Sequence, residues 1–260
     1  MKYFSLTLIF STLLLLQTMA QTDTLHLPEP IATDRPDQTE AAAIVPAGYV
    51  QMEFGFSHVE HKPGRTLILP NALLKYGVNE FFELRFITSY ASTRIDGQPD
   101  ADGFLPLTLG FKTKFTEEHG IWPKISLLGH FVLPGIVGND VAIKNLAPDF
   151  RFAFAHTLSK SFSLGYNLGV FWDGSNPEPV FIYSLAPGYS VGKFGFYVEG
   201  YGFIPQGSDR EVRFLMDGGM TYLVNNNLQL DLSYGHNVTD NFMESYTALG
   251  VSYRFRVKRQ

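Results

Sequence analysis

The chain has 260 residues, a formal net charge of −5 at pH 7 and no cysteine. The lack of cysteine excludes disulfides, thiol catalysis and thiolate metal sites. The only basic tract runs from Arg254 to Arg259, so nucleic-acid binding is not expected. The mean hydropathy of zero is too low for a bundle of membrane helices. It is typical of a barrel whose strands alternate apolar and polar side chains.

Residues 1–20 have the features of a secretory signal peptide. Lys2 precedes an apolar run from Leu6 to Leu16, and the stretch that ends at Ala20 resembles a cleavage site. The apolar run is about half of the ~20 residues that a membrane-spanning helix needs. Gln21 stands where a lipoprotein would need cysteine. We therefore expect a secreted chain without a lipid anchor.

Residues 21–47 have no sustained periodicity and contain four prolines. This composition predicts an extended segment that is not part of a regular sheet. It leaves open whether the segment folds into the domain that follows, caps the periplasmic mouth of that domain, or is a disordered leader.

From Tyr49 onward, apolar and polar residues alternate with a period of two, which a β-strand imposes. In the last stretch, residues 245–257, one face is apolar and the other is small or cationic. Loops are expected at 59–65 and 94–104, and a bulge near Gly200 would explain a switch of parity there. We predict about twelve strands, at residues 49–57, 71–76, 82–86, 107–115, 125–131, 149–158, 162–172, 181–191, 194–203, 213–222, 228–234 and 245–257.

These strands predict an all-β fold, an antiparallel transmembrane β-barrel over residues 48–258 with an N-terminal extended segment. The spacers alternate short and long, as periplasmic turns and external loops do in outer-membrane barrels. Trp122 and Trp172 fall at strand ends, where an interfacial aromatic belt would place them. We expect a monomer in the outer membrane of a Gram-negative bacterium. Its partners would be outer-membrane lipid and, through the C-terminal strand, the barrel-assembly machinery.

A family resemblance begins inside the N-terminal segment. The residues that carry it are Asp34-Arg35-Pro36, Thr39-Glu40, Val45-Pro46, Gly48, Gln51, Glu53 and Gly55. They resemble the opening signature of the bacterial family named for the meta-pathway of phenol degradation. The resemblance implies an outer-membrane transporter, not an enzyme of phenol chemistry. It does not identify the solute, which we expect to be small and hydrophobic or aromatic.

The polar parity of the strands predicts an inward set of charges of both signs. These charges either line a conduit that selects a solute or form ion pairs that fill a narrow lumen. The predicted gating or plug residues are Asp34, Arg35, Pro36 and Glu40, with Arg35 expected to meet inward carboxylates such as Glu53 or Glu83. The predicted lumen-lining residues are Glu53, Lys75, Glu83, Arg85, Lys112, Lys114, Asp149, Arg151, Arg213, Asp217, Asp231, Arg254 and Arg256.

Two catalytic or metal readings are weaker than transport. His58 and His61 lie in a predicted loop without the helix that would align them on a metal. An outer-membrane lipid hydrolase would need a Ser and His grouping, and His130 and His156 stand in strands without a nucleophile elbow. We therefore expect no enzyme, no cofactor and no metal. A structural or surface-binding barrel with a filled lumen is the alternative, and a secreted β-sandwich is a further one.

Overall fold

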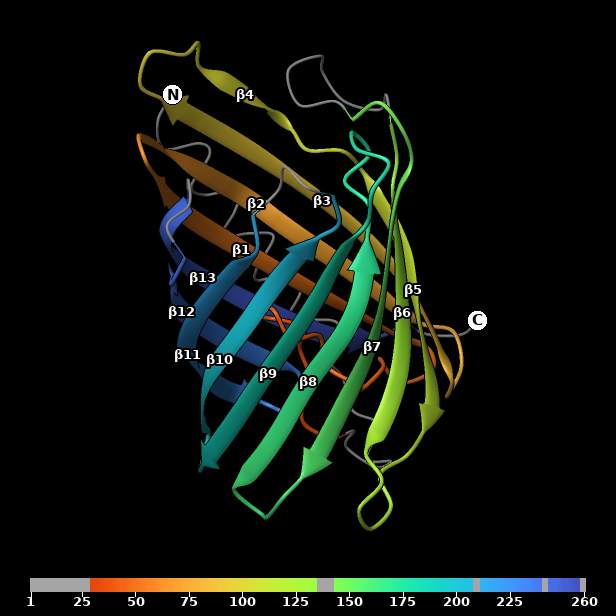
Figure 1. Ribbon diagram of the computed structural model, residues 1–260. Coiled ribbons are helices and arrows are strands. Elements are labelled where there is room, and N and C mark those ends of the chain that lie inside the picture. The colour runs from red at the N-terminus through yellow and green to blue at the C-terminus, as the bar shows by residue number, and fades with distance from the viewer. Residues whose placement is uncertain (1–28, 135–142, 208–210, 240–242, 258–260) are drawn as a thin grey trace, which may run out of the picture.

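The computed structural model describes residues 29–134, 143–207, 211–239 and 243–257 (Figure 1). The predicted signal peptide lies outside these residues. The strands are β1 (Tyr49–His61), β2 (Gly64–Gly77), β3 (Phe82–Ile95), β4 (Ala101–Phe104), β5 (Thr108–Thr116), β6 (Lys124–Val132), β7 (Ala147–Thr157), β8 (Phe162–Phe171), β9 (Val180–Val191), β10 (Phe194–Pro205), β11 (Arg213–Asn225), β12 (Leu228–Asn237) and β13 (Met243–Arg256).

Twelve of these strands form a closed antiparallel barrel. Sequential strands pair with each other, β3 pairs with β5, and β1 closes the ring by pairing with β13. The short strand β4 lies outside the ring and pairs with the outer part of β3. The predicted twelve-stranded barrel is confirmed. The prediction of a loop over residues 94–104 is wrong in part, because residues 101–104 form β4.

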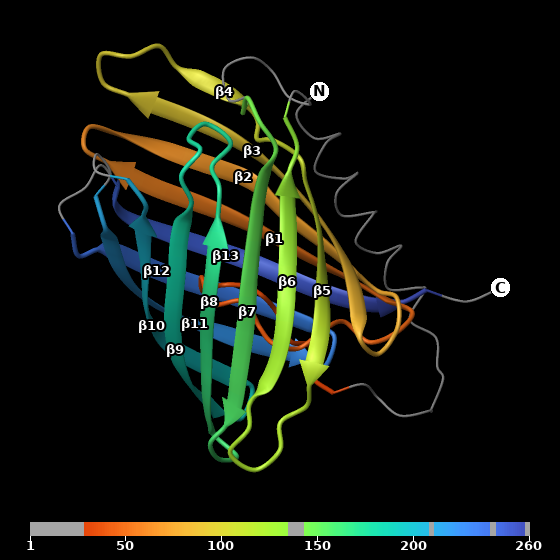
Figure 2. The same ribbon diagram turned by 45° about the vertical axis from the view of Figure 1, so that its right-hand side comes forward.

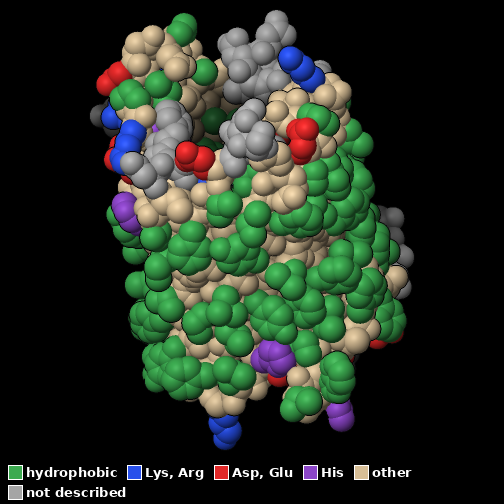
Figure 3. Space-filling view, viewed as in Figure 1, with side chains coloured by type: hydrophobic (Ala, Val, Ile, Leu, Met, Phe, Trp, Pro, Cys, Tyr) green, Lys and Arg blue, Asp and Glu red, His purple; other side chains and the backbone are tan. Residues whose placement is uncertain are grey.

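The two faces of the wall differ as the sequence pattern predicts. Outward side chains are large and apolar, such as Leu168, Phe181 and Leu249, which are 55%, 46% and 50% exposed. Figure 3 shows that such side chains cover the side of the barrel in a broad band, with charged side chains near its ends. Inward side chains are polar, charged or small. This apolar band on a closed barrel identifies an outer-membrane protein that contacts lipid.

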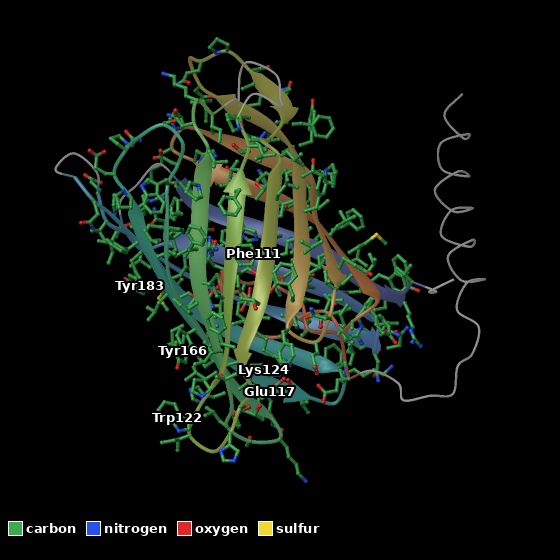
Figure 4. The ribbon with its side chains drawn as sticks, turned by 90° about the vertical axis from the view of Figure 1, so that its right-hand side faces the viewer. Phe111, Glu117, Trp122, Lys124, Tyr166 and Tyr183 are labelled. Atoms are coloured by element: carbon green, nitrogen blue, oxygen red, sulfur yellow. The ribbon has the colours of Figure 1, made fainter. Side chains whose placement is uncertain are left out.

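The two ends of the barrel have different connections. Short turns join β2 to β3, β7 to β8, β9 to β10 and β11 to β12 at one end. At the other end most connections are longer, although residues 62 and 63 alone join β1 to β2. Trp122 is 67% exposed in the β5–β6 connection, beyond the short-turn end, where Glu117 and Lys124 also lie (Figure 4). No helix among the described residues is long and apolar enough to span a bilayer.

Two sequence predictions about strand geometry are wrong. Residues 59–65 are mostly strand, because β1 extends to His61 and β2 starts at Gly64. The predicted bulge near Gly200 is not present, since β10 keeps one unbroken register with β11 through this residue. Tyr197 and Tyr201 therefore point into the barrel with the rest of their parity, and the switch of pattern marks inward aromatic residues.

Candidate functional site

Residues 29–46, called the N-terminal segment below, run through the interior of the barrel (Figure 2). At its start, Ile31 N–H donates to Asn226 O, in the β11–β12 turn, at 2.9 Å. Just after its end, Gly48 N–H donates to Gly77 O, at the end of β2, at 2.8 Å. Both contacts lie at the short-turn end of the barrel. The segment therefore enters and leaves the lumen at the same end, and its middle reaches toward the other end.

Asp34 binds three cations from three strands. Its Oδ2 accepts hydrogen bonds from Lys75 Nζ at 2.7 Å and from Arg85 at 2.9 Å, and its Oδ1 accepts from Lys112 Nζ at 2.7 Å. The residue is only 8% exposed. Burial alone would raise the pKa of Asp34, but Lys112, Lys75 and Arg85 hold that pKa well below its ordinary value. Asp34 is therefore a buried and ionised carboxylate.

The wall around Asp34 needs the negative charge that the segment brings. Three inward cations face only two wall carboxylates: Lys75, Arg85 and Lys112 against Glu53 and Glu83. Glu40 of the segment adds a second carboxylate, whose Oε2 accepts from Arg85 at 2.8 Å. Because buried charges are stable only when they are paired, wall and segment complete each other. These seven residues, with Asp34 and Glu40 included, are called the Asp34 network below.

Arg35 occupies a groove made by two glycines. Its guanidinium donates to Asp231 Oδ1 at 3.0 Å and to the carbonyl of Leu249 at 3.1 Å. Gly55 and Gly250 are directly opposite in the β1–β13 register. A Cβ at Gly55 would lie 2.2 Å from Arg35 Nη1, and one at Gly250 would lie 2.4 Å from Arg35 Nε. These strand glycines are therefore required by the close approach of Arg35 to the wall.

Wall side chains also satisfy the backbone of the segment, which has no secondary structure of its own. Asn167 Oδ1 accepts from the Glu40 N–H at 2.7 Å, and its Nδ2 donates to the Glu40 carbonyl at 3.1 Å. Ser126 Oγ donates to the Ala42 carbonyl at 2.6 Å. Backbone groups away from water need such partners. The sequence of the wall is thus matched to one path of the segment.

A second group of inward carboxyls has different surroundings. Glu199 and Asp217 face each other in the β10–β11 register, and Asp37 of the segment lies beside them. Glu199 accepts from the Thr39 hydroxyl at 2.5 Å, and Asp217 accepts from the Tyr246 hydroxyl. Among the described residues, no Lys or Arg pairs with any of the three carboxyls. We call Asp37, Glu199 and Asp217 the acidic cluster.

The titration of Asp37 reflects these surroundings. Burial, and then the neighbouring carboxyl of Glu199, raise the pKa of Asp37 well above its ordinary value. Asp34 and Asp37 are three residues apart in the sequence, and their pKa values are shifted in opposite directions.

Two cavities lie on opposite sides of the N-terminal segment. The turn-side cavity has a volume of about 380 Å³ and reaches Lys124, near the short-turn end. The loop-side cavity has a volume of about 350 Å³, and its lining combines aliphatic and tyrosine side chains, such as Val59, Leu73 and Tyr246, with charged ones, namely Asp34, Arg35, Asp37, Glu40, Glu53 and Arg85. Both cavities are lined by the same four residues of the segment: Arg35, Pro36, Asp37 and Glu40. The segment therefore separates the two cavities.

The sequence model of one family, described as "Putative MetA-pathway of phenol degradation", matches residues 33–255. The chain belongs to this family. The resemblance seen in residues 33–55 is thereby confirmed and extends across the barrel. A search among curated proteins found no match.

Solved structures share the fold of this family member. The COG4313 outer membrane channel from Pseudomonas putida F1 aligns with a TM-score of 0.69 at 12% identity, covering 86% of this chain and 100% of that chain. The NanC porin aligns with a TM-score of 0.53 at 10% identity, covering 78% of this chain and 98% of that chain. The KdgM porin gives 0.52 at 10% identity, with 79% and 99% covered. At these identities the likeness concerns the fold alone.

The other predicted lumen residues of this family member lie in separate places. Arg151 pairs with Asp149 at 2.8 Å, and His130 lies 3.9 Å from the same carboxylate. The guanidinium of Arg213 stacks over the ring of Phe203 at 4.7 Å.

Three further predicted lumen residues lie toward the short-turn end. Arg254 donates to the carbonyl of Glu29 at the start of the segment, at 2.6 Å. Lys114 pairs with Glu117. Arg256 is opposite Tyr49 in the β1–β13 register.

Arg35 pairs with an inward carboxylate, but this is Asp231 and not one of the two that the sequence offered as examples, Glu53 and Glu83. Barrel closure places β12 and β13 beside that part of the segment, which sequence order alone does not show. His58 and His61 lie on opposite faces of β1, because an odd separation in a strand reverses the side chain. They cannot share a metal ion in this arrangement.

Sequence reasoning also missed residues that the site uses. Glu199, Asp37, Asn167 and Ser126 were not among the predicted site residues. Glu199 was hidden because aromatic residues share its parity, which obscured which face of β10 points inward. The available signal was its own charge in the middle of a membrane-spanning strand, since such a residue faces the interior.

Proposed function

We propose that this protein is an outer-membrane channel for small hydrophobic or aromatic molecules, and that the N-terminal segment closes it. The observation that carries the proposal is the pair of cavities, of about 350 and 380 Å³, with the same segment residues between them. A solute that crosses the lumen must pass this segment. Asp34, Arg35, Pro36 and Glu40 then act as the gate, as the sequence pattern suggested.

The lining of the loop-side cavity supports the proposed class of solute. Its lining includes the aliphatic side chains Val59, Ile68 and Ile87 of β1 to β3, with Tyr246 beside Val59 on β13 and Tyr201 on β10. Sites for small organic molecules combine apolar and aromatic surface of this kind with polar groups that fix the orientation of the ligand. The charges of the Asp34 network then serve mainly to hold the gate, since they are paired with each other.

A hydrolase is disfavoured by the geometry of the wall. His130 points into the lumen and is buried. His156 of β7 lies on the lipid-facing side of the wall, where its ring stacks against that of Tyr166 in the neighbouring strand β8. The two histidines lie on opposite faces of the wall, so they cannot form one catalytic group. We therefore propose that the barrel transports and does not catalyse. We also propose that it is a monomer that is inserted by the barrel-assembly machinery through β13.

A reversible lock tests the gate. The chain has no cysteine, so a pair at Thr39 and Gly165 would be unique. A Cβ at Gly165 would lie 3.2 Å from the Thr39 side chain, within reach of a disulfide. Vesicles that contain Thr39→Cys, Gly165→Cys should pass a small aromatic solute when reduced and not when oxidised. The single-cysteine variants, treated with the same oxidant, are the controls.

The same assay distinguishes the structural alternative. Deletion of residues 29–46 should give permanent flux and single-channel current if the segment is a gate. Flux that is absent from the reduced pair, from the unmodified chain and from the deletion would overturn the channel proposal. The lumen would then be filled in every form, and the function would lie with the loops.

A further inference from the structure

Four residues in the middle of the N-terminal segment, Pro36 to Thr39, are held differently from the residues on either side of them. Before them, Asp34 pairs with three cations of the wall. After them, Glu40 pairs with Arg85, and its backbone N–H and carbonyl both bond to Asn167. We call these four residues the tip. The tip therefore lies between two arms of the segment that are each attached through ion pairs.

The tip is bonded to the wall mainly through one carboxylate, that of Glu199 in β10. Its Oε2 accepts from the Gln38 N–H at 2.7 Å, and its Oε1 accepts from the Thr39 hydroxyl at 2.5 Å. Among the described residues, the only other hydrogen bond between the tip and the wall joins the Thr39 and Ser184 hydroxyls at 2.6 Å. Glu199 is buried, and Asp217 of β11 hydrogen-bonds it from the neighbouring strand. The carboxylate of Glu199 is therefore held in a fixed position against the tip.

The tip adds few attachments of its own. Pro36 has no N–H to donate. No Lys or Arg among the described residues pairs with Asp37, and the neighbouring carboxyls of Glu199 and Asp217 disfavour a negative charge on it. The attachment of the tip thus depends on the hydrogen bonds to Glu199, whereas both arms are also held by ion pairs.

The tip stands between the two cavities. Pro36 and Asp37 line both of them, as do Arg35 and Glu40 at the two ends of the tip. Gln38 lines the loop-side cavity. Movement of a short stretch between fixed points is a common form of conformational switching. Displacement of the tip alone would join the cavities while the ion pairs of both arms stay intact.

We propose that Glu199 is the latch of the channel, a positioning residue whose hydrogen bonds hold the tip between the two cavities. Opening then breaks these hydrogen bonds and moves the tip, while both arms of the segment stay in place. This inference rests on the proposed channel function and refines it. The moving part of the gate becomes four residues, and the remainder of the segment becomes its fixed frame.

Two spin-labelled positions test which part of the segment Glu199 holds. The chain has no cysteine, so Gln38→Cys labels the tip alone and Ala43→Cys labels the second arm alone, each beside a cavity. A label at Gln38 keeps the backbone N–H that donates to Glu199. Glu199→Ala should make the tip label mobile and leave the arm label as immobile as before. A gain of mobility at the arm label, or none at the tip label, would overturn the latch.

Single-channel recording tests whether the same hydrogen bonds close the channel. The loss of two hydrogen bonds to a buried carboxylate should raise the open probability of Glu199→Ala at least about tenfold over that of the unsubstituted chain. Because both arms stay in the lumen, each opening should carry less current than the permanent pore of the chain that lacks residues 29–46. Openings as large as that pore, or an unchanged open probability, would overturn the proposal.

Two further variants separate the latch from a general loss of structure. Glu60→Ala removes a carboxylate from the outer face of β1, where Glu60 Oε1 lies 3.1 Å from His58 Nε2, and should leave both labels and the open probability unchanged. If Glu199→Ala does not refold, Thr39→Val removes one hydrogen bond to Glu199 from the segment and leaves the wall intact. It should also make the tip label more mobile, and an unchanged tip label in this variant would overturn the latch.

The latch and the channel can fail separately. No current from the chain that lacks residues 29–46 would remove the channel, and the two labels would still show whether Glu199 holds the tip. Current from that chain, together with a tip label that Glu199→Ala does not mobilise, would keep the channel and remove the latch.

Discussion

Two sides of the lumen hold the same segment in different ways. On the side of β2, β3 and β5, Asp34 meets Lys75, Arg85 and Lys112, and the charges are paired. On the side of β10 and β11, Asp37 meets Glu199 and Asp217, and the charges have one sign. The segment is therefore held by ion pairs at Asp34. Three residues further along the chain, at Asp37, ion pairs are lacking, and the nearby Gln38 and Thr39 hold the segment only through hydrogen bonds to Glu199 and, from Thr39, to Ser184.

This difference suggests how the gate can respond to a ligand. The Asp34 network pairs three buried cations of the wall with carboxylates of the segment, so it holds the segment whether or not a solute is present. The acidic cluster has no Lys or Arg partner among the described residues, so it adds no ion pair to the attachment of the segment. A ligand can shift an equilibrium only through a difference in affinity between two states. The acidic cluster is the part of the lumen where such a difference can arise.

The largest expected effect comes from Asp34→Asn. The substitution removes the charge that three buried cations share, and breaking a buried ion pair from one side costs about 3–5 kcal/mol. The free energy of unfolding, measured by urea titration in detergent or vesicles, should fall by about this amount. Channel current should also rise, since the segment loses its main attachment.

The control for this variant is Asp102→Asn. Asp102 pairs with Arg94 at 2.8 Å in an exposed position, where solvent screens the ion pair and its loss should change stability little. If both variants lose the same stability, the Asp34 network does not hold the segment more strongly than a surface pair holds a loop. The two sides of the lumen would then not differ in the free energy with which they hold the segment.

The sequence predicts the wall better than it predicts the contents of the lumen. A period of two is visible in one strand at a time, so the barrel, its strands and the inward charges such as Lys75 and Arg85 follow from local pattern. The contacts of Asp34 with Lys112 and of Arg35 with Asp231 join residues that are 78 and 196 positions apart. They depend on barrel closure and register, which local pattern does not contain.

Two residue types were also ambiguous for a physical reason. Gly55 and Gly250 fit any narrow lumen, and only the β1–β13 register shows that together they make room for Arg35. Tyr197 and Tyr201 look lipid-facing because aromatic side chains usually are in such a wall. The inward side of β10 is aromatic, so hydrophobicity gave the wrong face there.

Gly250→Ala should have the next largest effect. The added methyl group would lie 2.4 Å from Arg35 Nε and 2.5 Å from Asp231 Oδ2, so the guanidinium must leave its groove. Overpacking of this kind costs about 1–3 kcal/mol. Gly200→Ala is the matched control, since its methyl group would meet only the Phe214 ring at 3.2 Å. Urea titration should show a larger loss in the free energy of unfolding for Gly250→Ala than for Gly200→Ala. Equal losses would argue against a groove that binds Arg35 specifically.

Asp37→Asn should have a smaller effect of opposite sign. The substitution removes like-charge repulsion with Glu199 and Asp217, so the segment should be held more firmly at pH 7. A gain of about 0.5–2 kcal/mol is typical of single stabilising substitutions. A spin label at Ala32→Cys, the only cysteine in such a chain, reports how far the segment is immobilised. A more mobile label in Asp37→Asn would contradict the idea that this side of the lumen repels the segment.

The pH dependence of the same spin-label signal should be the smallest effect. Asp34 and Asp37 should each cause a separate part of it. The lowered pKa of Asp34 means that its contribution is present above the unfolded pKa of about 3.9 and is lost as the pH falls through the lower folded value. The raised pKa of Asp37 means that its contribution is full below about 3.9 and is lost as the pH rises toward the folded value. The carboxyls that face Asp37 are Asp34 of the segment, Glu199 of β10 and Asp217 of β11, which act in the same direction on it.

Immobilisation of the segment should therefore fall as the pH rises from about 3.9 toward the raised folded pKa of Asp37, with a slope below about 1.4 kcal/mol per pH unit for one proton. Asp37→Asn should abolish this fall and keep the loss at acid pH, whereas Asp34→Asn should remove the loss at acid pH. A profile that is flat in the unsubstituted chain, or that Asp37→Asn does not change, would mean that the acidic cluster does not act on the segment. The Asp34 network alone would then set the position of the gate.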